Sequence, residues 1–439
     1  MKRLTKLLLT FIILFVVTIN VYAKDTVYSV NKYDDEKLIF IEDSYNKNNK
    51  KDGVVTVGTY KKEEVEKDDN KYDDYQIMLI KYKSNGKTDW TYRYGKTSSE
   101  EINSLLYTYD NNKINGYLMV ISNSYDINSS TTPESIFVKI DLDGKLVEEK
   151  NTSLNSEEVI KKLIPTYSID DVVDGYIGIT NTSIIKYDKN LNLIYRKNIE
   201  NKELIDIIDV YNEKELSSYT LITKEVLENN EYNIKLISYN KELTEEKLIK
   251  ENIELTNPKL SQTDNGFIIY GITTEVKLKK SDTTYYLSKY NNQNEEEWES
   301  FGTIPLQEDS NLVLKSVVDK DKYEYFIFYK NIDNSFEVVT LDDEGLLKKK
   351  IKKINNNYYN FTSFHLNKNK KHMYFIGQIN CLEDESCEYD NNSLFLISDE
   401  DKVIEVQDSV SYNTIIICLL LIVLIGVGIF YTKKKKVTK

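Results

Sequence analysis

One strand unit recurs along this 439-residue chain, and its recurrence constrains the fold more than any other feature. Each copy begins with a turn glycine and a hydrophobic strand. A second strand follows, in which polar and apolar residues alternate and which ends in a Tyr-Asp or Asn-Gly sequence. A third strand ends near an aromatic residue. Short Val-, Ile- and Tyr-rich runs separated by Asn, Asp and Gly predict strands, and hardly any stretch keeps a helical period. We therefore expect an all-β chain, with the clearest copies at 53–92, 116–147, 175–195 and 266–298.

The copies extend to about seven four-stranded units that recur roughly every 45 to 60 residues, the range of propeller blades. Four-stranded sheets that stack face to face around an axis bury the apolar faces that each sheet cannot bury alone. The sequence therefore predicts a β-propeller. The last unit is predicted to have its four strands at 358–366, 372–378, 393–397 and 403–407. The segment 27–33 either adds a strand to this last blade and closes the ring, or is a frayed end.

Several phrases within the units resemble a known repeat. The runs 52–58 (DGVVTVG), 80–86 (IKYKSNG) and 175–191 are similar to the repeats of bacterial quinoprotein-like and related β-propeller proteins. The resemblance covers most of residues 38–407, is strong in about four copies, and implies the fold alone. No positions match a quinone-cofactor site, and the vicinal cysteine pair of some of those enzymes is absent, so no catalytic residue and no cofactor are implied.

The N-terminal residues have the pattern of an export signal. Lys2, Arg3 and Lys6 precede the apolar stretch 7–19, and Val21-Tyr22-Ala23 suits a signal peptidase. We expect a signal peptide over residues 1–23, with cleavage after Ala23.

A second apolar segment lies near the other end of the sequence. Residues 414–432 carry no charge, and about nineteen helical residues at 1.5 Å each would span roughly 30 Å of hydrocarbon. Lys433–Lys436 follow at once, which places the basic tail 433–439 in the cytoplasm. A buried core helix is the alternative. We expect a single-pass cell-membrane protein with an extracellular propeller domain at 24–413.

The charge of the expected outer domain excludes one class of partner. The whole chain has a formal net charge of −13 from 58 basic and 71 acidic residues, and the two terminal segments remove eight basic residues, leaving 50 − 71 = −21. Such a surface repels phosphate backbones, so we expect no nucleic-acid binding. The acidity suits a cation or a basic partner, or it simply keeps an exported domain soluble.

Two cysteines predict a disulfide. Cys381 and Cys387 flank Leu-Glu-Asp-Glu-Ser in a late extracellular loop, where an oxidising compartment would join them. Their spacing is not that of zinc or thioredoxin-like sites, and only His365 and His372 could assist a metal.

Acidic clusters are the candidate metal sites, with calcium as the candidate ion. Asp141-Leu142-Asp143-Gly144 begins like an EF-hand loop but lacks the later ligands, so a hairpin turn is favoured. Two other clusters either hold a cation or are solvated loops, which we favour. They are Asp68, Asp69, Asp73 and Asp74, and Glu383, Asp384 and Glu385.

Catalytic patterns are weak. His365 and His372 lie on neighbouring predicted strands without a Gly-x-Ser-x-Gly partner. Trp90 and Trp298 could stack on sugars, but both occupy the aromatic position of the repeat, where packing is the favoured role. Carboxylate pairs for glycoside chemistry are too numerous among 71 acids to single out.

These observations favour a non-catalytic binding or scaffold protein with an extracellular protein or glycan as partner. The longer loops 61–75, 125–134 and 276–284 join second and third strands, and we expect them on one rim of the ring, facing the partner. The alternative is an exported carbohydrate-active enzyme that uses paired carboxylates.

Overall fold

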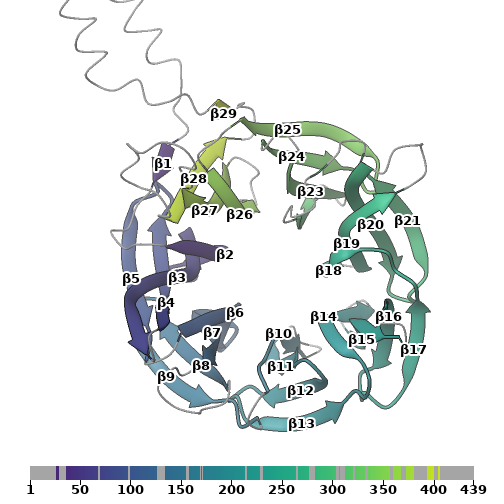
Figure 1. Ribbon diagram of the computed structural model, residues 1–439, viewed down its shortest axis with the longest axis horizontal. Helices are drawn as coiled ribbons and strands as arrows, with labels where there is room; N and C mark the ends of the chain where they lie inside the picture. Colours follow the sequence, from purple (N-terminus) through teal and green to yellow (C-terminus); the bar gives the residue numbers. More distant parts are fainter. Residues whose placement is uncertain are drawn as a thin grey trace, which may run out of the picture.

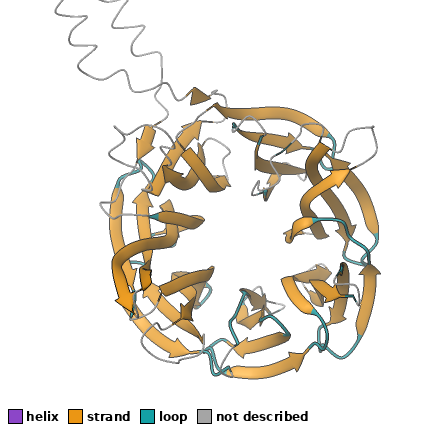
Figure 2. Ribbon diagram, viewed as in Figure 1, coloured by secondary structure: helices purple, strands orange, loops and turns teal. Residues whose placement is uncertain are grey.

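The computed structural model shows strands wherever it assigns regular secondary structure (Figure 2). It describes residues 26–28, 36–67, 70–96, 99–125, 134–154, 158–168, 170, 172–212, 215–227, 231–263, 265–275, 282–302, 306, 312–319, 322–331, 335–355, 359–366, 372–379, 393–399 and 404–405.

The described chain folds into an all-β propeller with six clear four-stranded blades and a partial seventh. The sheets stand around a central axis, with β2, β6, β10, β14, β18 and β26 nearest the centre and β5, β9, β13, β17, β21 and β25 at the periphery (Figure 1). This confirms the predicted fold class.

Each of the six blades consists of four consecutive strands in antiparallel order. The first three blades are β2 (Lys37–Tyr45), β3 (Lys51–Lys67), β4 (Asn70–Lys83) and β5 (Thr88–Tyr94); β6 (Ser99–Asp110), β7 (Lys113–Tyr125), β8 (Glu134–Asp141) and β9 (Leu146–Asn151); and β10 (Lys162–Tyr167), β11 (Val173–Ile179), β12 (Ser183–Asp188) and β13 (Leu193–Asn198). The next three are β14 (Glu203–Asn212), β15 (Glu215–Val226), β16 (Tyr232–Asn240) and β17 (Glu246–Lys250); β18 (Thr256–Thr263), β19 (Gly266–Glu275), β20 (Asp282–Asn291) and β21 (Glu296–Phe301); and β22 (Val313–Asp319), β23 (Lys322–Lys330), β24 (Phe336–Leu341) and β25 (Leu347–Asn355).

The hydrophobic core lies between neighbouring blades. One cluster joins Val57 and Leu79 of the first blade to Tyr117, Met119 and Val138 of the second, all of them almost fully buried. Equivalent clusters lie between the second and third, fourth and fifth, and fifth and sixth blades. Stacking of the sheets therefore buries the apolar faces, as the repeat predicts.

The propeller has two ends that differ in their connections. We call the end with the tight connections 46–50, 84–87, 111–112 and 142–145 and their equivalents the turn end, because first and second strands, and third and fourth strands, are joined there. The opposite end, the loop end, carries the connections between second and third strands and those between blades. All six blades share this topology, so the three longer connections predicted to share a rim lie at one end.

The seventh sheet contains β26 (Tyr359–Leu366), β27 (His372–Ile379) and β28 (Ser393–Asp399). Strand β1 (Thr26–Tyr28) pairs with β28 in antiparallel register, Val27 opposite Leu396. The predicted closing strand is thus confirmed at Val27 and Tyr28, and 29–33 lie outside the described residues.

The fourth strand predicted for the last blade at 403–407 is wrong. Strand β29 (Ile404–Glu405) pairs in parallel with β25 of the sixth blade, Ile404 opposite Ile354. The reason is that β1 already occupies the outer edge of β28, and one edge of a strand accepts only one neighbour. The end of the chain therefore extends the neighbouring sheet.

The loop predicted at 61–75 is instead a long hairpin. Strands β3 and β4 continue to pair past Lys61, which is opposite Tyr75, and after one register shift before Glu63 they pair as far as Lys67 opposite Asn70. Val65 and Tyr72, which are opposite each other, are residues that favour strands, but the charged composition of the stretch predicted a loop. Residues 126–133 and 276–281 of the other two predicted loops lie outside the described residues.

Several predictions from the sequence fall on residues that the structure does not describe. These are the signal peptide 1–23, the membrane segment 414–432, the tail 433–439, and the disulfide between Cys381 and Cys387. Over the described ranges, the structure contains no helix of the length and apolarity needed to cross a membrane.

Candidate binding site

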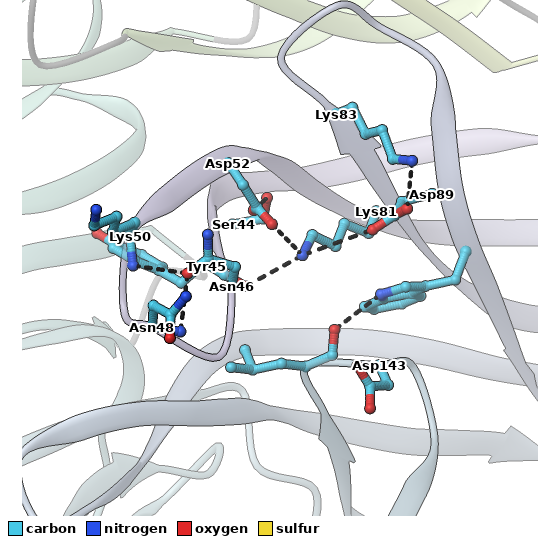
Figure 3. A network of polar contacts seen from close by, with 12 residues as sticks. Ser44, Tyr45, Asn46, Asn48, Lys50, Asp52, Lys81, Lys83, Asp89 and Asp143 are labelled. Carbon is cyan, nitrogen blue, oxygen red and sulfur yellow. Dashed lines mark hydrogen bonds and ion pairs between the residues drawn. The ribbon is translucent and has the colours of Figure 1, made fainter.

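Tryptophan side chains join neighbouring blades at the turn end. The indole Nε1 of Trp90, on β5, donates to the carbonyl of Leu142 in the next blade at 3.0 Å (Figure 3). Trp298 makes the same bond to Asp343, also at 3.0 Å. A Cβ on Gly144 would lie 2.6 Å from the Trp90 ring, so glycine is required beneath the indole. The favoured packing role of both tryptophans agrees with these contacts.

The Asp141–Gly144 segment is a hairpin turn, as favoured from its sequence. Asp141 Oδ1 accepts hydrogen bonds from the amides of Asp143 and Lys145 at 2.9 and 2.8 Å. Asp143 pairs with Lys47 of the first blade at 2.7 Å, which holds the pKa of the Asp143 carboxyl below its usual value. Both carboxylates are thus used in the turn and in the joint between blades.

The first blade presents a rigid edge to this turn (Figure 3). Lys81 is buried and donates to the Tyr45 carbonyl at 3.1 Å and to Asp52 at 2.8 Å. Asn46 Oδ1 accepts from the amides of Asn48 and Lys50, which fixes the connection between β2 and β3.

Lysines of the fourth strands contact the following blade at the next two joints, two residues beyond the position that tryptophan occupies in β5 and β21. Lys150 of β9 donates to the Asn190 carbonyl at 2.8 Å and to Asn192 Oδ1 at 2.7 Å. Lys197 of β13 donates to the Leu243 carbonyl at 2.5 Å. These bonds hold the third and fourth blades at the turn end while covering less of the joint than an indole does.

A cavity of about 170 Å³ lies between the second and third blades at the turn end. Most of its wall comes from the second blade, and the third blade contributes a buried tyrosine and a lysine on its turn. The lining residues are Thr108, Tyr109, Asn115, Lys139, Ile140, Val147, Glu148, Tyr176 and Lys189.

The cavity combines aromatic rings with charged and polar groups. Burial raises the pKa of Tyr176 to about 12, with Tyr109 adding to the shift, so this phenol stays neutral near pH 7. Lys139 and Glu148 form an ion pair at 2.7 Å on the wall, and Thr108 donates to Asn115 Oδ1 at 2.7 Å.

This set of groups suits recognition of a small polar ligand with an apolar face. Val147 is 64% exposed and adds an apolar edge, while Lys189 is exposed on the turn of the third blade. Pockets that bind small molecules typically pair such aromatic walls with a few polar groups that fix orientation.

Tyr109 belongs to a line of tyrosines at the ends of inner strands. Tyr109, Tyr167 and Tyr211 end β6, β10 and β14 in successive blades. Burial raises the pKa of Tyr109 while a hydrogen bond with Tyr167 opposes the shift, and the Tyr211 hydroxyl accepts from the Tyr167 amide at 3.2 Å. This site was not predicted from the sequence. The sequence contained one signal for it: a tyrosine stands at the equivalent position of three repeat units, near the end of a strand and before a turn.

The two histidines of the sequence lie on neighbouring strands of the partial seventh blade. His365, on β26, lies with Nε2 2.5 Å from Asp43 Oδ1 on β2, across the seam between the partial seventh blade and the first. Burial alone would raise the pKa of Asp43, but the hydrogen bonds and charges of His365 and Lys51 outweigh it and lower that pKa. His372 begins β27, with its backbone opposite Asp399. Both histidines lie on the strands predicted for them, whereas the partner Asp43 was not predicted.

A pair of carboxyl groups lies between the first two blades, toward the loop end. Asp74 is 5% exposed and Glu100 is 3% exposed, and the Lys96 amide donates to Glu100 Oε1 at 2.8 Å. Burial is the main cause that raises the pKa of Glu100 to about 7; the bond from Lys96 opposes it and the charge of Asp74 adds to it.

The predicted acidic clusters are only partly covered by the structure. Asp73 and Asp74 are in β4, whereas Asp68, Asp69, Glu383, Asp384 and Glu385 lie outside the described residues. Among the residues that the structure does describe, no group of three or more His, Cys, Asp or Glu side chains is arranged to hold a metal ion.

Comparison with known proteins finds distant structural likenesses. No protein-family model matches the sequence, and no curated protein matches it. The chain is similar to the WD40 domain of Toxoplasma gondii coronin, with 9% identity, a TM-score of 0.46 and 88% of each chain covered. It is also similar to the β-propeller domain of the Trilobed protease from Pyrococcus furiosus, with 10% identity, a TM-score of 0.42, and 85% of this chain and 99% of that chain covered. At these identities the likeness concerns the propeller fold alone.

Proposed function

We propose that this protein is a non-catalytic binding protein on the outside of the cell membrane, and that the turn end of its propeller receives the partner. The observation that carries the proposal is the cavity between the second and third blades. It opens where two rigid sheets meet, and the lysine joint at Asn190 fixes the spacing of its walls.

The partner that the cavity favours is a glycan. Pockets for drug-sized ligands have roughly 300–1,000 Å³, so a cavity of about 170 Å³ holds a single ring of a longer chain. The rings of Tyr109 and Tyr176 suit the C–H face of a sugar. Glu148 and Asn115 offer acceptors for hydroxyl groups, and Lys139 and Lys189 offer donors.

A glycan array with the full-length protein in nanodiscs, followed by titration calorimetry of the strongest ligand, tests the proposal. We expect Tyr109→Ala to weaken binding about tenfold, because one good contact contributes roughly 1–2 kcal/mol. The matched control is Tyr211→Ala, the same strand position two blades away. Equal affinities in both variants and the parent protein would rule out the cavity.

The loop end is the alternative binding surface, because the three loops predicted to face the partner connect strands at that end. A variant that lacks residues 64–73 of the β3–β4 hairpin together with 126–133 and 276–281 leaves the cavity intact. We expect this variant to retain glycan binding. Loss of binding with an unchanged circular dichroism spectrum would assign the partner to the loop end instead.

The closure of the ring, the relationship to other repeat proteins and the membrane anchor are part of the same proposal. We propose a closed ring of seven blades, with β1 completing the last, related to quinoprotein-like repeat proteins and anchored by residues 414–432. Alkaline carbonate should leave the full-length protein in the membrane fraction, and external protease should reach the propeller in intact cells. Release by carbonate would exclude the anchor.

A second candidate function, a carbohydrate-active enzyme, is favoured by Glu100. A carboxyl group with a pKa of about 7 next to a second carboxylate has the properties of a general acid. Both Asp74 and Glu100 are at least nine-tenths buried, so the substrate would have to open the joint between the blades. Product release from a glycan panel that disappears in Glu100→Gln would support an enzyme and displace the binding proposal.

A further inference from the structure

The cavity between the second and third blades lies where the repeat departs from the pattern of two other blades. In the first and fifth blades, a tryptophan of the fourth strand stands opposite a buried lysine of the third; the pairs are Trp90 with Lys81 and Trp298 with Lys289. In the second blade, the residue opposite Lys139 is Glu148. A carboxylate of the cavity wall therefore stands at the position that an indole occupies in the two other blades.

The acid that pairs with this lysine has moved by one residue. In the first and fifth blades it precedes the tryptophan, and the carboxylates of Asp89 and Glu297 lie 3.9 and 2.8 Å from the lysine ammonium groups. In the second blade Lys139 pairs with Glu148 itself at 2.7 Å, and the residue before Glu148 is the exposed Val147. The order of acid and bulky side chain is thus reversed, which puts the acid on the joint.

The turn on the other wall of the cavity changes too. At the first joint the second residue of the turn is Leu142, which is buried and whose carbonyl accepts from the Trp90 indole. At the cavity the equivalent residue is Lys189, because Asp141 and Asp188 each accept the amide two residues further on at 2.9 Å. Lys189 is exposed, and no carboxylate in the described part of the chain forms an ion pair with it.

The walls of the cavity consequently carry more positive than negative charge. Lys139 and Lys189 are the two cations among the lining residues, and Glu148 is the one carboxylate, already paired with Lys139. Asp188 precedes Lys189 in sequence but accepts three hydrogen bonds from groups of its own turn. A lysine that lines a cavity without a carboxylate partner favours an anionic group on the ligand.

We propose that the sugar ring held in this cavity carries a carboxylate, and that Lys189 binds it, an inference that rests on the proposed glycan-binding function. The glycan then belongs to the class that contains uronic or sialic acids. The ligand carboxylate accepts a charge-assisted hydrogen bond from the Lys189 ammonium and balances the charge of that wall. The rings of Tyr109 and Tyr176 remain available for the C–H face of the same sugar.

A panel of acidic oligosaccharides tests this assignment. It contains glucuronate, galacturonate and sialic acid compounds, each beside the same compound with its carboxyl groups reduced to alcohols. Binding to the full-length protein in phosphatidylcholine nanodiscs is measured by titration calorimetry. We expect at least one carboxylated compound to bind about tenfold more tightly than its reduced form, because charge-assisted hydrogen bonds are roughly twice as strong as neutral ones.

Three variants assign the effect to one side chain. Lys189→Gln should remove the preference for the carboxylated compound and leave the affinity for the reduced one unchanged, since glutamine still donates a hydrogen bond. Lys189→Arg should retain the preference. The matched control is Lys241→Gln, at the same turn position of the fourth blade, where Lys241 lies 4.0 Å from Glu215. Lys189 and Lys241 are both exposed, so neither substitution changes the core.

Failure of the carboxylate assignment is distinguishable from failure of the function on which it rests. Equal affinities within every pair of compounds, with weaker binding in Tyr109→Ala, would overturn the assignment and keep the cavity as the glycan site. A preference that survives Lys189→Gln, or that Lys241→Gln reduces as much, would overturn the role of Lys189. No binding of any compound, the reduced ones included, would overturn both proposals.

Discussion

At the scale of single residues, the joints between blades show two solutions to one packing problem. The turn between third and fourth strands has a left-handed residue in each case. It is Gly144 (φ 82°) in the second blade, beneath Trp90, and Leu191 (φ 59°) in the third, next to Lys150. Leu191 is 1% exposed, and its side chain packs in the core between the second and third blades. The preceding blade contributes Trp90 at the turn with Gly144 and Lys150 at the turn with Leu191.

The match between the turn residue and the side chain that covers it predicts how substitutions at the two positions combine. Gly144→Leu alone should lower the free energy of unfolding by about 2–4 kcal/mol, because a branched side chain meets the Trp90 ring and a non-glycine residue adopts positive φ. Adding Trp90→Lys should recover part of the loss. Urea unfolding of the single and double variants measures the coupling, and strictly additive effects would contradict this match.

Glu100 predicts a pH dependence of stability. Its pKa is about 7 in the folded protein, against an ordinary value of 4.5 for a glutamate side chain, so the folded state binds more protons between these values. The stabilisation is complete below pH 4.5 and is lost as the pH rises through 7, a loss on the order of 3 kcal/mol. Thermal unfolding should show a Tm that falls from about pH 5 to about pH 8 in the parent protein and changes less in Glu100→Gln. Parallel profiles would indicate that Glu100 is not the group responsible.

The residues whose position follows from the local repeat could be predicted from the sequence. Gly144 and Trp90 were identified by the repeat, since turn and strand-end positions are local. Tyr176, Glu100 and Asp43 were not, because their environment comes from a neighbouring blade. Whether a side chain is buried between two sheets depends on which sheets meet. The sequence alone does not give the distance between residues of different blades.

At the scale of elements, the strands of the six clear blades follow the predicted pattern apart from the longer β3–β4 hairpin, and the other departure occurs where an edge is shared. β29 joins the sixth blade because β1 takes the edge of β28. Each of these pairings depends on a segment distant in sequence. An alternating pattern indicates that a strand forms and leaves its neighbour undetermined.

The closing strand β1 provides a prediction at this scale. Replacing Thr26–Tyr28, which pair with β28, with three glycines adds backbone entropy that must be lost when the strand forms. We expect the Tm to fall by several degrees and hydrogen exchange to increase in β26–β28 ahead of the other blades. The same replacement at the exposed turn 188–190 is the control. Uniform exchange in all sheets would mean that β1 does not hold the partial seventh blade.

At the scale of the whole molecule, the topology separates two ends with different connections. The cavity and the tyrosine line are at the turn end, and the exit of the chain at Glu405 is at the loop end. The repeat allowed this polarity to be predicted in part, since three long connections were assigned to one rim. The site itself was expected on that rim, whereas the cavity in the structure is at the opposite end.

This polarity predicts one-sided labelling in cells. An amine-reactive biotin reagent that does not cross membranes should label Lys189, at the turn end, several-fold faster than Lys96, which lies in the connection from β5 to β6 at the loop end. Because Lys96 is ion-paired with Glu149, rates are divided by those of the detergent-solubilised protein. A ratio near one would mean that the propeller has no fixed orientation on the cell.

The pairing of β29 with β25 also sets the path of mechanical force through the molecule. Tension applied at the C-terminal side of Glu405 is delivered first to the sixth blade, through two residue pairs. That short contact is the weakest link in series with the ring, so it should separate before any blade unfolds. The separated chain then gains the length of its detached residues as slack while the blades stay folded.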